Sequence, residues 1–220
     1  MSEFLRITEI FHSIQGESTR AGLPCTFVRL TGCPLRCVWC DTEYAFHGGD
    51  RMTLDEIVAR VESIGTPLVE VTGGEPLAHR PAFTLVRMLL DRGFTVLVET
   101  SGAFDISPLD PRAQRIMDLK CPGSGEMARN LWSNLEHLRA GDEVKFVIAD
   151  RADYEWAAGI VRERLAPLVE AGRLGALLFS PVWDRLDLKD LAAWILEDRL
   201  PVRYQIQMHK VIWGANVPGV

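Results

Sequence analysis

Apolar residues in this chain fall into two alternating patterns, short continuous runs and longer stretches with helical spacing. The runs are typical of buried strands and cover residues 25–31, 68–72, 95–99, 115–119, 143–148, 175–180 and 203–206. The helical stretches cover residues 81–92, 154–165 and 188–196, and a further helix is expected from Thr53, where Glu56 completes a capping-box pattern. This alternation predicts right-handed βαβ units in an α/β fold with a mostly parallel sheet.

Polar or glycine-rich residues directly follow most of the predicted strands. These stretches are Gly32-Cys33, Thr72–Glu75, Glu99–Gly102, Asp118–Lys120 and Ser180-Pro181. Because ligands bind at the carboxyl ends of parallel strands, we expect one site assembled from all of them. A closed eight-stranded barrel usually needs ~250 residues. With seven predicted strands in 220 residues, the chain is expected to form an incomplete, TIM-like β/α barrel as a single domain, residues 1–220.

Composition and charge exclude several classes of protein. With 47% hydrophobic and 25% charged residues, the chain has the composition of a globular protein and not of a disordered or collagen-like one. Its net charge of −6 and the lack of a basic stripe disfavour direct binding to nucleic acid. No apolar run is long enough to span a membrane, and no basic region followed by an apolar stretch opens the sequence, so we expect a cytoplasmic protein without a membrane partner.

The cysteines carry the clearest chemical signal. There are five, an odd number that does not suit a disulfide framework, and Cys33, Cys37 and Cys40 lie close together. Thiolates are soft ligands for zinc or iron–sulfur clusters, but a closed site of either kind requires four ligands. Three thiolates on a four-iron cluster leave one iron open for an exogenous ligand. Cys25 is expected to be a buried non-ligand and Cys121 a partly exposed non-ligand near the cofactor; a non-catalytic zinc or iron–sulfur module is the alternative from another class.

The spacing Cys-x3-Cys-x-aromatic-Cys, with Trp39 as the aromatic residue, resembles the cluster loop of the radical S-adenosylmethionine enzymes. The resemblance implies a [4Fe–4S] cluster whose open iron binds S-adenosylmethionine, and reductive cleavage of that cofactor to a 5′-deoxyadenosyl radical. The segment Thr72–Pro76 resembles the Gly-Gly-Glu motif of the same superfamily. Glycine at that position lets the backbone approach the methionine amino group of the cofactor.

Three further segments are similar to the 7-carboxy-7-deazaguanine synthases: Glu9–Ser18, Phe27–Cys33 with Cys40–Thr42, and Gln205–Trp213. The resemblance implies a radical lyase that contracts the ring of 6-carboxy-5,6,7,8-tetrahydropterin, releases ammonia and forms 7-carboxy-7-deazaguanine. The product is an intermediate towards queuosine and related 7-deazapurines of tRNA. Regenerated S-adenosylmethionine, Mg²⁺, a homodimer, and a flavodoxin or ferredoxin as electron donor are also implied.

The same resemblance assigns residues to each ligand, and it names no catalytic side chain beyond the cluster and the cofactor. The cluster would be held by Cys33, Cys37 and Cys40, and Mg²⁺ by the hard hydroxyl oxygen of Thr42, which is otherwise a helix cap. The candidates for binding S-adenosylmethionine are Trp39, Cys40, Asp41, Gly74, Ser101, Asp118, Leu119, Lys120 and Ser180. Lys120 would meet the methionine carboxylate.

The substrate candidates are Ile14, Gln15, Gly16, Glu17, Arg29, Thr72 and His209. Arg29 offers the planar, bidentate donor that the pterin carboxylate needs. Gln15, Glu17 and Thr72 offer donors and acceptors for the pterin amide edge. His209 would bond the substrate or transfer a proton, although a structural histidine fits the sequence equally well.

A glycyl-radical-enzyme activase is the nearest alternative, because such activases share the three-cysteine loop and a stretch like Asp118–Lys120. An activase must expose its site to a partner protein. The resemblance to the synthases predicts instead a substrate-sized pocket that the C-terminal tail closes.

Overall fold

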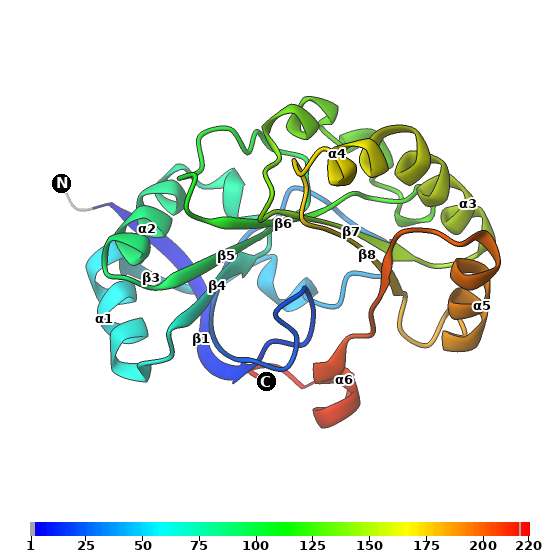
Figure 1. The fold of residues 1–220 in the computed structure, drawn as a ribbon. Helices are drawn as coiled ribbons and strands as arrows, with labels where there is room; N and C mark the ends of the chain where they lie inside the picture. Colours follow the sequence, from blue (N-terminus) through cyan, green and yellow to red (C-terminus); the bar gives the residue numbers. More distant parts are fainter. Residues whose placement is uncertain (1–2, 216) are drawn as a thin grey trace.

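The computed structural model describes residues 3–215 and 217–220, and its strands form one nine-stranded sheet in the order β3-β1-β2-β4-β5-β6-β7-β8-β9. The strands are β1 (Phe4–Ile14), β2 (Pro24–Leu30), β3 (Asp50–Thr53), β4 (Leu68–Gly73), β5 (Thr95–Thr100), β6 (Gln114–Asp118), β7 (Glu143–Ile148), β8 (Ala176–Pro181) and β9 (Arg203–Tyr204). The strands from β2 through β4 to β9 pair in parallel, whereas β1 and β3 are antiparallel. The sheet arches without closing (Figure 1), which confirms the incomplete barrel.

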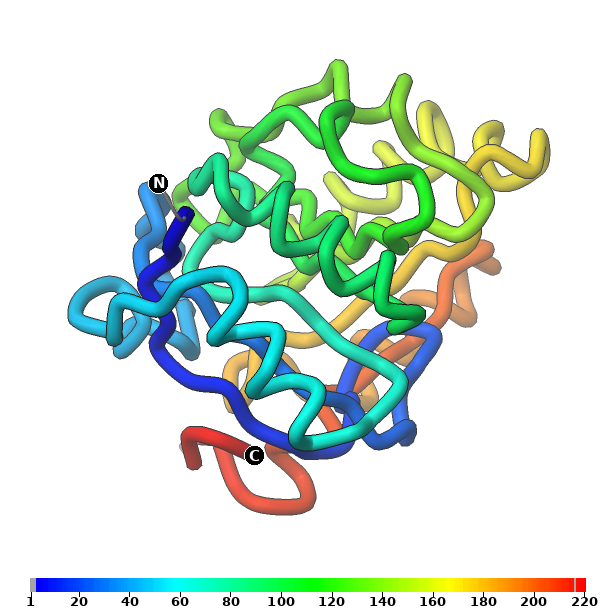
Figure 2. Tube along the Cα trace, turned by 90° about the vertical axis from the view of Figure 1, so that its left-hand side faces the viewer, coloured from blue at the N-terminus to red at the C-terminus, as the bar shows by residue number. Residues whose placement is uncertain are grey.

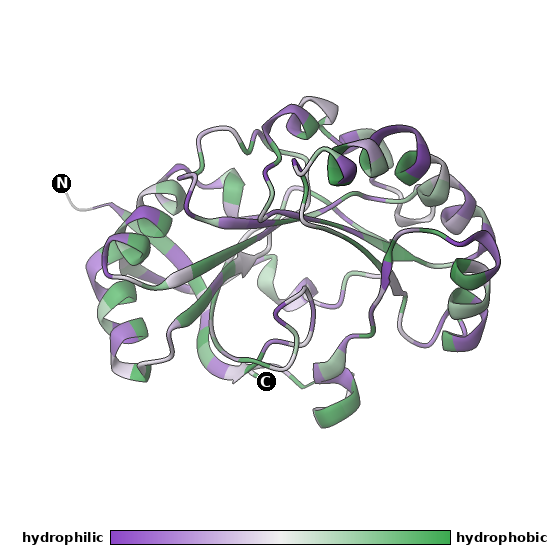
Figure 3. Cartoon of the chain, in the orientation of Figure 1, coloured by the Kyte–Doolittle hydropathy of each residue, from purple (hydrophilic) through white to green (hydrophobic). Residues whose placement is uncertain are grey.

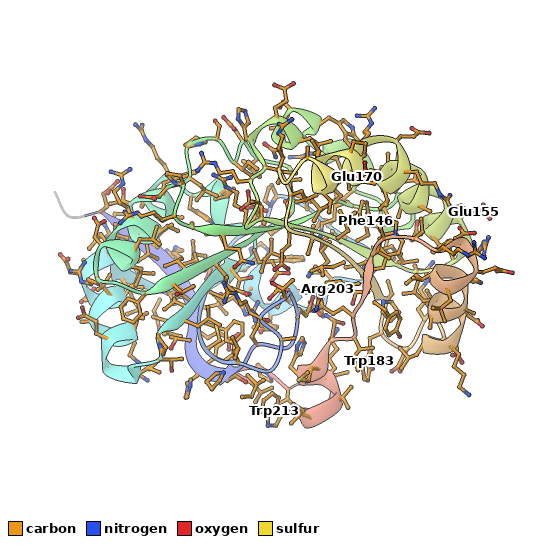
Figure 4. All side chains as sticks on the ribbon, viewed as in Figure 1. Phe146, Glu155, Glu170, Trp183, Arg203 and Trp213 are labelled. Carbon is orange, nitrogen blue, oxygen red and sulfur yellow. The ribbon has the colours of Figure 1, made fainter. Side chains whose placement is uncertain are left out.

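Helices cover the outer, convex face of the arch (Figure 1). They are α1 (Leu54–Ile64), α2 (Arg80–Asp91), α3 (Arg151–Ile160), α4 (Ala166–Glu170) and α5 (Leu188–Asp198), while α6 (Met208–Trp213) lies on the concave side. The strands are largely hydrophobic and the covering helices carry residues of both kinds (Figure 3). The main core lies between these helices and the sheet. Phe146 of β7 packs there edge-on against Trp156 and Phe179, whereas Glu155 and Glu170 point outward (Figure 4).

All seven predicted strands are present, and the structure adds β1 and β3 to them. The missed strands are the edge strand β3 and its neighbour β1, and both have mixed polarity: β3 reads Asp-Arg-Met-Thr, and most residues of β1 are half-buried or exposed. The predicted capping box of α1 is confirmed, since Glu56 N donates to Thr53 Oγ1 and Thr53 N donates to Glu56. α3 begins at Arg151 because the Asp150 side chain accepts from Asp153 N and caps it.

Every second residue of each strand points to the concave face, and these residues form two layers. One is a small apolar cluster of Cys25, Phe27, Leu68, Leu97 and Ile116, against which Phe11 packs. The other we call the inner polar layer, and it takes one residue from each of four adjacent strands: Glu70 (β4), Glu99 (β5), Asp118 (β6) and Lys145 (β7). Ionisable side chains thus line the inside of the arch.

The loop between β1 and β2 covers the end of the open barrel at which the parallel strands begin. Because β1 is antiparallel to β2, this loop starts at the opposite end of the sheet from Cys33. Its Thr19 donates to Glu143 at the start of β7, and its Arg20 donates to Gln114 at the start of β6. The last residues of the chain lie beside the end of β1 (Figure 2). No helix in the described part of the chain is long and apolar enough to cross a membrane.

Candidate active site

The concave side holds a cavity of about 760 Å³ that gathers nearly all of the predicted site residues. Those that line it are Ile14, Gln15, Gly16, Glu17, Arg29, Cys33, Cys37, Trp39, Cys40, Asp41, Thr42, Thr72, Gly74, Ser101, Asp118, Lys120 and His209. Two candidates do not line it: Leu119 belongs to the hydrophobic core and Ser180 is buried within β8. The cavity therefore joins segments from both ends of the sequence with the carboxyl ends of the central strands.

The three cysteines of the cluster loop all face this cavity. Burial raises the pKa of the Cys37 thiol to about 11, although Lys120 opposes the shift, and burial also raises the pKa of Cys33. Ionised thiolates at this place therefore need a positively charged partner. A donor set of three soft thiolates beside a roomy cavity fits an iron–sulfur cluster with one open iron. Within residues 3–215 and 217–220, no three Cys, His, Asp or Glu side chains are grouped so that they hold a single metal ion.

The segment after β6 holds the cluster loop on both sides of Cys37. The amide of Arg36 donates to Glu126 Oε1 at 2.7 Å, and the amide of Val38 donates to the carbonyl oxygen of Ser124 at 3.0 Å. Ser124 is itself buried and its hydroxyl donates to the Cys121 carbonyl oxygen. Two backbone hydrogen bonds thus fix the conformation of the loop next to its central cysteine.

Gly74 comes so close to the cluster loop that no side chain fits. A Cβ atom on Gly74 would lie 2.0 Å from the carbonyl oxygen of Gly32, the residue before Cys33. The adjacent Glu75 donates its amide to that same oxygen, while its buried carboxylate accepts from Thr100 Oγ1 and from the amide of Ser101. Glu75 therefore fixes Ser101, and the bare Gly74 backbone is the part that faces the cavity.

Asp118 and Lys120 form an ion pair at the end of β6, with 2.8 Å between Oδ2 and Nζ. Burial lowers the pKa of Lys120, but the charges of Asp118 and Cys37 and the hydrogen bond to Asp118 together outweigh it, so the pKa is raised and the charged ammonium is favoured. Among the described residues, the buried Oδ1 atom of Asp118 finds no hydrogen-bond partner. Asp118, which lines the cavity, thus has an unpaired acceptor oxygen and a cation beside it. This pair fits a ligand that has both hydrogen-bond donors and a carboxylate, as S-adenosylmethionine does.

Arg29 projects from β2 into the other part of the cavity. Its Nε donates to Glu9 Oε1 at 2.7 Å, and the same oxygen accepts from the Tyr44 hydroxyl. The guanidinium carbon lies 5.9 Å from the Phe11 ring centroid and 6.0 Å from that of Tyr44. Contacts on these sides orient the guanidinium group so that it can meet an anionic ligand group in the cavity.

The β1–β2 loop reaches the inner polar layer through Gln15 and Glu17. Gln15 donates to Glu70 and accepts from the amide of Glu17. Glu17 forms an ion pair with Lys145 at 2.7 Å, and Lys145 also contacts Glu99. Burial and the nearby Glu99 raise the pKa of Glu70, which favours its protonated form.

The C-terminal tail covers this arrangement. Gln207 donates to Glu17 Oε1 at 2.9 Å and to Asp41 Oδ2 at 3.1 Å, and Lys210 pairs with Asp41 at 2.6 Å. The ring of His209 packs directly on Gly16, where a Cβ atom would lie 2.5 Å from Nδ1. Burial lowers the pKa of His209 and so favours the neutral ring. Trp183, after β8, also lines the cavity and lies near the tail (Figure 4).

Several residues of the site were missed in the sequence: Glu9, Tyr44, Glu70, Glu99, Lys145, Gln207 and Lys210. Three of them carry a usable signal, since Glu70, Glu99 and Lys145 are charged residues inside or at the end of otherwise apolar strands. The expected burial of Cys25 is confirmed, because it is fully buried in the apolar cluster. The expected partial exposure of Cys121 is wrong: it is 1% exposed and belongs to the main core.

The chain is similar to known proteins over most of its length. The sequence profile of the radical SAM superfamily matches residues 27–121. A 7-carboxy-7-deazaguanine synthase of Koribacter versatilis is 43% identical, over 98% of this chain and 100% of the relative. That of Chlorobaculum tepidum is 46% identical, over 98% of this chain and 97% of the relative. Among solved structures, QueE from Escherichia coli shares the fold with a TM-score of 0.73 at 23% identity, over 94% of this chain and 95% of that chain.

The similarity covers the cluster loop, the inner strands and the tail together, because it extends over nearly the whole chain. The radical SAM profile implies the [4Fe–4S] cluster and S-adenosylmethionine, which the three thiols and the Gly74 backbone fit. The chain belongs to the 7-carboxy-7-deazaguanine synthases, a family of radical S-adenosylmethionine lyases.

Proposed function

We propose that residues 1–220 form a single catalytic domain that converts 6-carboxy-5,6,7,8-tetrahydropterin into 7-carboxy-7-deazaguanine and ammonia. The observation that carries the proposal is the content of one cavity of about 760 Å³. It contains three thiols for the cluster, a glycine backbone beside them, an oriented arginine and a set of buried carboxyl groups. Together these groups suit a cofactor and a small, polar, anionic heterocycle.

Arg29 is proposed to bind the carboxylate of the substrate. Its Nε donates to Glu9 and its Nη1 to the Gly73 carbonyl oxygen at 3.5 Å, and no bond from Nη2 is found among the described residues. Thr42 is proposed to bind Mg²⁺ at the same end of the pocket. Its hydroxyl lies 3.9 Å from Cys40 Sγ and 3.3 Å from Asp41 Oδ1, so an oxygen ligand stands directly beside the cluster loop.

Gly74, Ser101, Asp118 and Lys120 are proposed to bind S-adenosylmethionine, together with Trp39, Cys40 and Asp41 of the cluster loop. When bound, the cluster and this cofactor supply the radical chemistry that removes a hydrogen atom from the substrate. The protein holds the reactants in place and excludes water: Gln15, Gly16, Glu17, Thr72 and His209 line the substrate side, and the tail covers it.

We also propose a homodimer and a flavodoxin or ferredoxin as the electron donor. Exposed apolar residues on α6 support an interface, since Val211 is 58% and Ile212 is 52% exposed. Val38, at the centre of the cluster loop, is 67% exposed, so the loop is accessible from outside the cavity. A cytoplasmic enzyme that acts on a free pterin, without contact to nucleic acid, agrees with the net charge of −6.

The test is an anaerobic reaction of the reconstituted chain with the carboxytetrahydropterin, S-adenosylmethionine, Mg²⁺ and dithionite. We expect 7-carboxy-7-deazaguanine and one equivalent of ammonia, detected by mass spectrometry and an ammonia assay. Iron and sulfide analysis and the electron paramagnetic resonance spectrum establish that the cluster is intact. No deazaguanine product from protein with an intact cluster would refute the proposal, and a tightly bound zinc in place of iron would favour the structural module.

A further inference from the structure

Lys145 is the buried cation of the inner polar layer, and the proposed function gives it no role so far. Its side chain is 5% exposed and projects from β7 into the cavity. Nζ lies 2.7 Å from Glu17 Oε2 and also contacts Glu99 Oε1. One ammonium group therefore joins two carboxylates, one from the β1–β2 loop and one from β5.

Both partners of Lys145 also have contacts to parts of the site that surround the substrate. Glu17 accepts from Gln207 of the tail at 2.9 Å, and its amide donates to Gln15. Glu99 accepts from the Thr72 hydroxyl at 3.4 Å. Lys145 thereby fixes two acceptors whose other contacts reach the tail, the loop and β4.

No other described cation contacts these two carboxylates. The groups that influence or face Lys145 are Glu17 of the loop, Glu70 of β4, Glu99 of β5, Asp118 of β6, Lys120 after β6, Asp41 of the cluster loop and His209 of the tail. Lys120 is already paired with Asp118, and Glu70 is bonded to the neutral amide of Gln15. Among the described residues, Lys145 is therefore the cation that pairs with both Glu17 and Glu99.

Removal of this cation would leave two partly buried carboxylates without a charged partner. A carboxyl group that takes up a proton donates a hydrogen bond where the carboxylate only accepted. Burial alone would raise the pKa of Glu99, and Lys145 reverses this shift and lowers it. A tetrahydropterin presents several N–H groups, and ionised carboxylates are matched to such donors.

We propose that Lys145 is a positioning residue that keeps Glu17 and Glu99 as hydrogen-bond acceptors and so sets the preference of the pocket for an N–H-rich heterocycle. The identity of that heterocycle rests on the proposed function. Lys145 acts through the two carboxylates and takes no part in the hydrogen-atom transfer.

The test compares the reconstituted wild-type chain with Lys145→Met, Lys145→Arg and Arg115→Met. Arg115 is a matched control because it is also a fully buried cation on a neighbouring strand, paired with Asp142 at 2.9 Å, and does not line the cavity. The probe is 6-carboxypterin, a fluorescent and unreactive pterin, whose Kd is measured by titration. Thermal unfolding of each variant, and the pH profiles of kcat and of KM for the carboxytetrahydropterin, are measured alongside.

We expect Lys145→Met to raise the Kd of 6-carboxypterin at least about 30-fold at neutral pH, because two partly buried carboxylates lose their charged partner. Its kcat/KM should recover as the pH rises and Glu99 ionises without Lys145. Lys145→Arg should keep the Kd within about threefold, since it retains the charge. Arg115→Met should lower the unfolding temperature and leave the Kd unchanged.

Two results would overturn the role of Lys145. One is a loss of binding in Lys145→Met that is equal at every pH or no larger than that of Arg115→Met. The other is a folded Lys145→Arg variant that binds 6-carboxypterin as weakly as Lys145→Met, and this second comparison decides the matter if Lys145→Met does not fold. Failure of the wild-type chain to form deazaguanine would refute the proposed function separately, because the binding titration does not depend on turnover.

Discussion

Lys210 of the C-terminal tail and Asp41 of the cluster loop form an ion pair with 2.6 Å between Nζ and Oδ2. Asp41 stands between Cys40 and Thr42, and Lys210 is only 7% exposed. Gln207 donates to the same Asp41 oxygen at 3.1 Å. The tail that covers the pocket is therefore attached to the loop that carries the cluster ligands, so the two parts of the site are linked mechanically.

Substitution of Lys210 by Met should release the tail from the cluster loop. We expect KM for the carboxytetrahydropterin to rise about tenfold, because a charge-assisted contact of this kind contributes about 1.5–3 kcal/mol. Steady-state kinetics on the reconstituted enzyme measure the change. Lys189→Met, on the exposed surface of α5, is the control. An unchanged KM in Lys210→Met would show that the ion pair does not hold the tail over the substrate.

Substitution of Gly74 by Ala should disrupt the site of S-adenosylmethionine. The new methyl group would lie 2.0 Å from the Gly32 carbonyl oxygen, so two backbone segments would have to separate next to Cys33. We expect the affinity for S-adenosylmethionine, measured by equilibrium dialysis, to fall at least tenfold, in line with an overpacking cost of about 1–3 kcal/mol. Gly141→Ala is the matched control, since nothing lies within 4 Å of its Cβ position. Equal affinities in the two variants would contradict the role of the close approach.

Substitution of Arg29 by Lys should weaken substrate binding although it keeps the charge. A lysine cannot bond Glu9 and a substrate carboxylate at the same time with a planar fork of donors. KM is expected to rise about tenfold or more, with a smaller change in kcat. Arg87→Lys on the exposed face of α2 should leave both constants unchanged. If Arg29→Lys retains the wild-type KM, Arg29 does not bind the carboxylate.

Substitution of Glu126 by Gln should loosen the cluster loop at its centre. The Arg36 amide would exchange a charged acceptor at 2.7 Å for a neutral one, and a bond to a charged group is the stronger by about 1 kcal/mol. We expect iron to be lost to a chelator several-fold faster and the paramagnetic resonance spectrum of the reduced cluster to change. Glu136→Gln, an exposed carboxylate elsewhere, is the control. The same iron-release rate in both variants would rule out a positioning role for Glu126.

Glu70→Gln should change the stability of the protein in a pH-dependent manner. Burial, followed by the charge of Glu99, raises the pKa of Glu70 above that of the unfolded chain. The native state therefore favours the protonated form, and its stability falls as the pH rises from the unfolded value of about 4.3 through the native one. Gln15 and Glu99 find a neutral amide at this position in the variant, which resembles the protonated carboxyl group.

We expect the variant to unfold at a higher temperature than the wild type at alkaline pH and at a similar temperature near pH 5. Scanning calorimetry under anaerobic conditions provides the measurement. Glu163→Gln, an exposed carboxylate, should show no such dependence. A difference between Glu70→Gln and wild type that stays constant with pH would mean that Glu70 is not protonated in the native state.

The parallel part of the fold was predictable because the apolar pattern that indicates each strand lies within the strand itself. Strands such as β4 and β8 consist of residues that are all buried, and they read as largely apolar runs in the sequence. β1 was not predictable in this way, because it pairs on both edges and most of its residues are half-buried or exposed. Its position depends on contacts with β2 and β3 that no local pattern specifies.

The candidate site shows the same division. The cysteine loop and Gly74 were found from motifs, whereas Lys145 was missed because a lone lysine in a strand has no motif. Its role depends on its contacts with Glu17, 128 residues away in the sequence, and with Glu99, 46 residues away. Ser180 has the expected place at a strand end and pairs with Val147, which lines the cavity, but Ser180 itself is 1% exposed and does not line it. A position at a strand end does not fix whether a side chain is covered by its neighbours.

The contact between Gln207 and Glu17 has a consequence for the order in which the protein is made. These residues are 190 positions apart, so their hydrogen bond forms only when nearly the entire chain has been synthesised. Contacts across such long loops carry the largest entropic cost and form late in folding. The cysteine loop, whose supporting segment ends near Glu126, can adopt its conformation well before that. The cluster loop can therefore be in place before the tail joins it through Asp41.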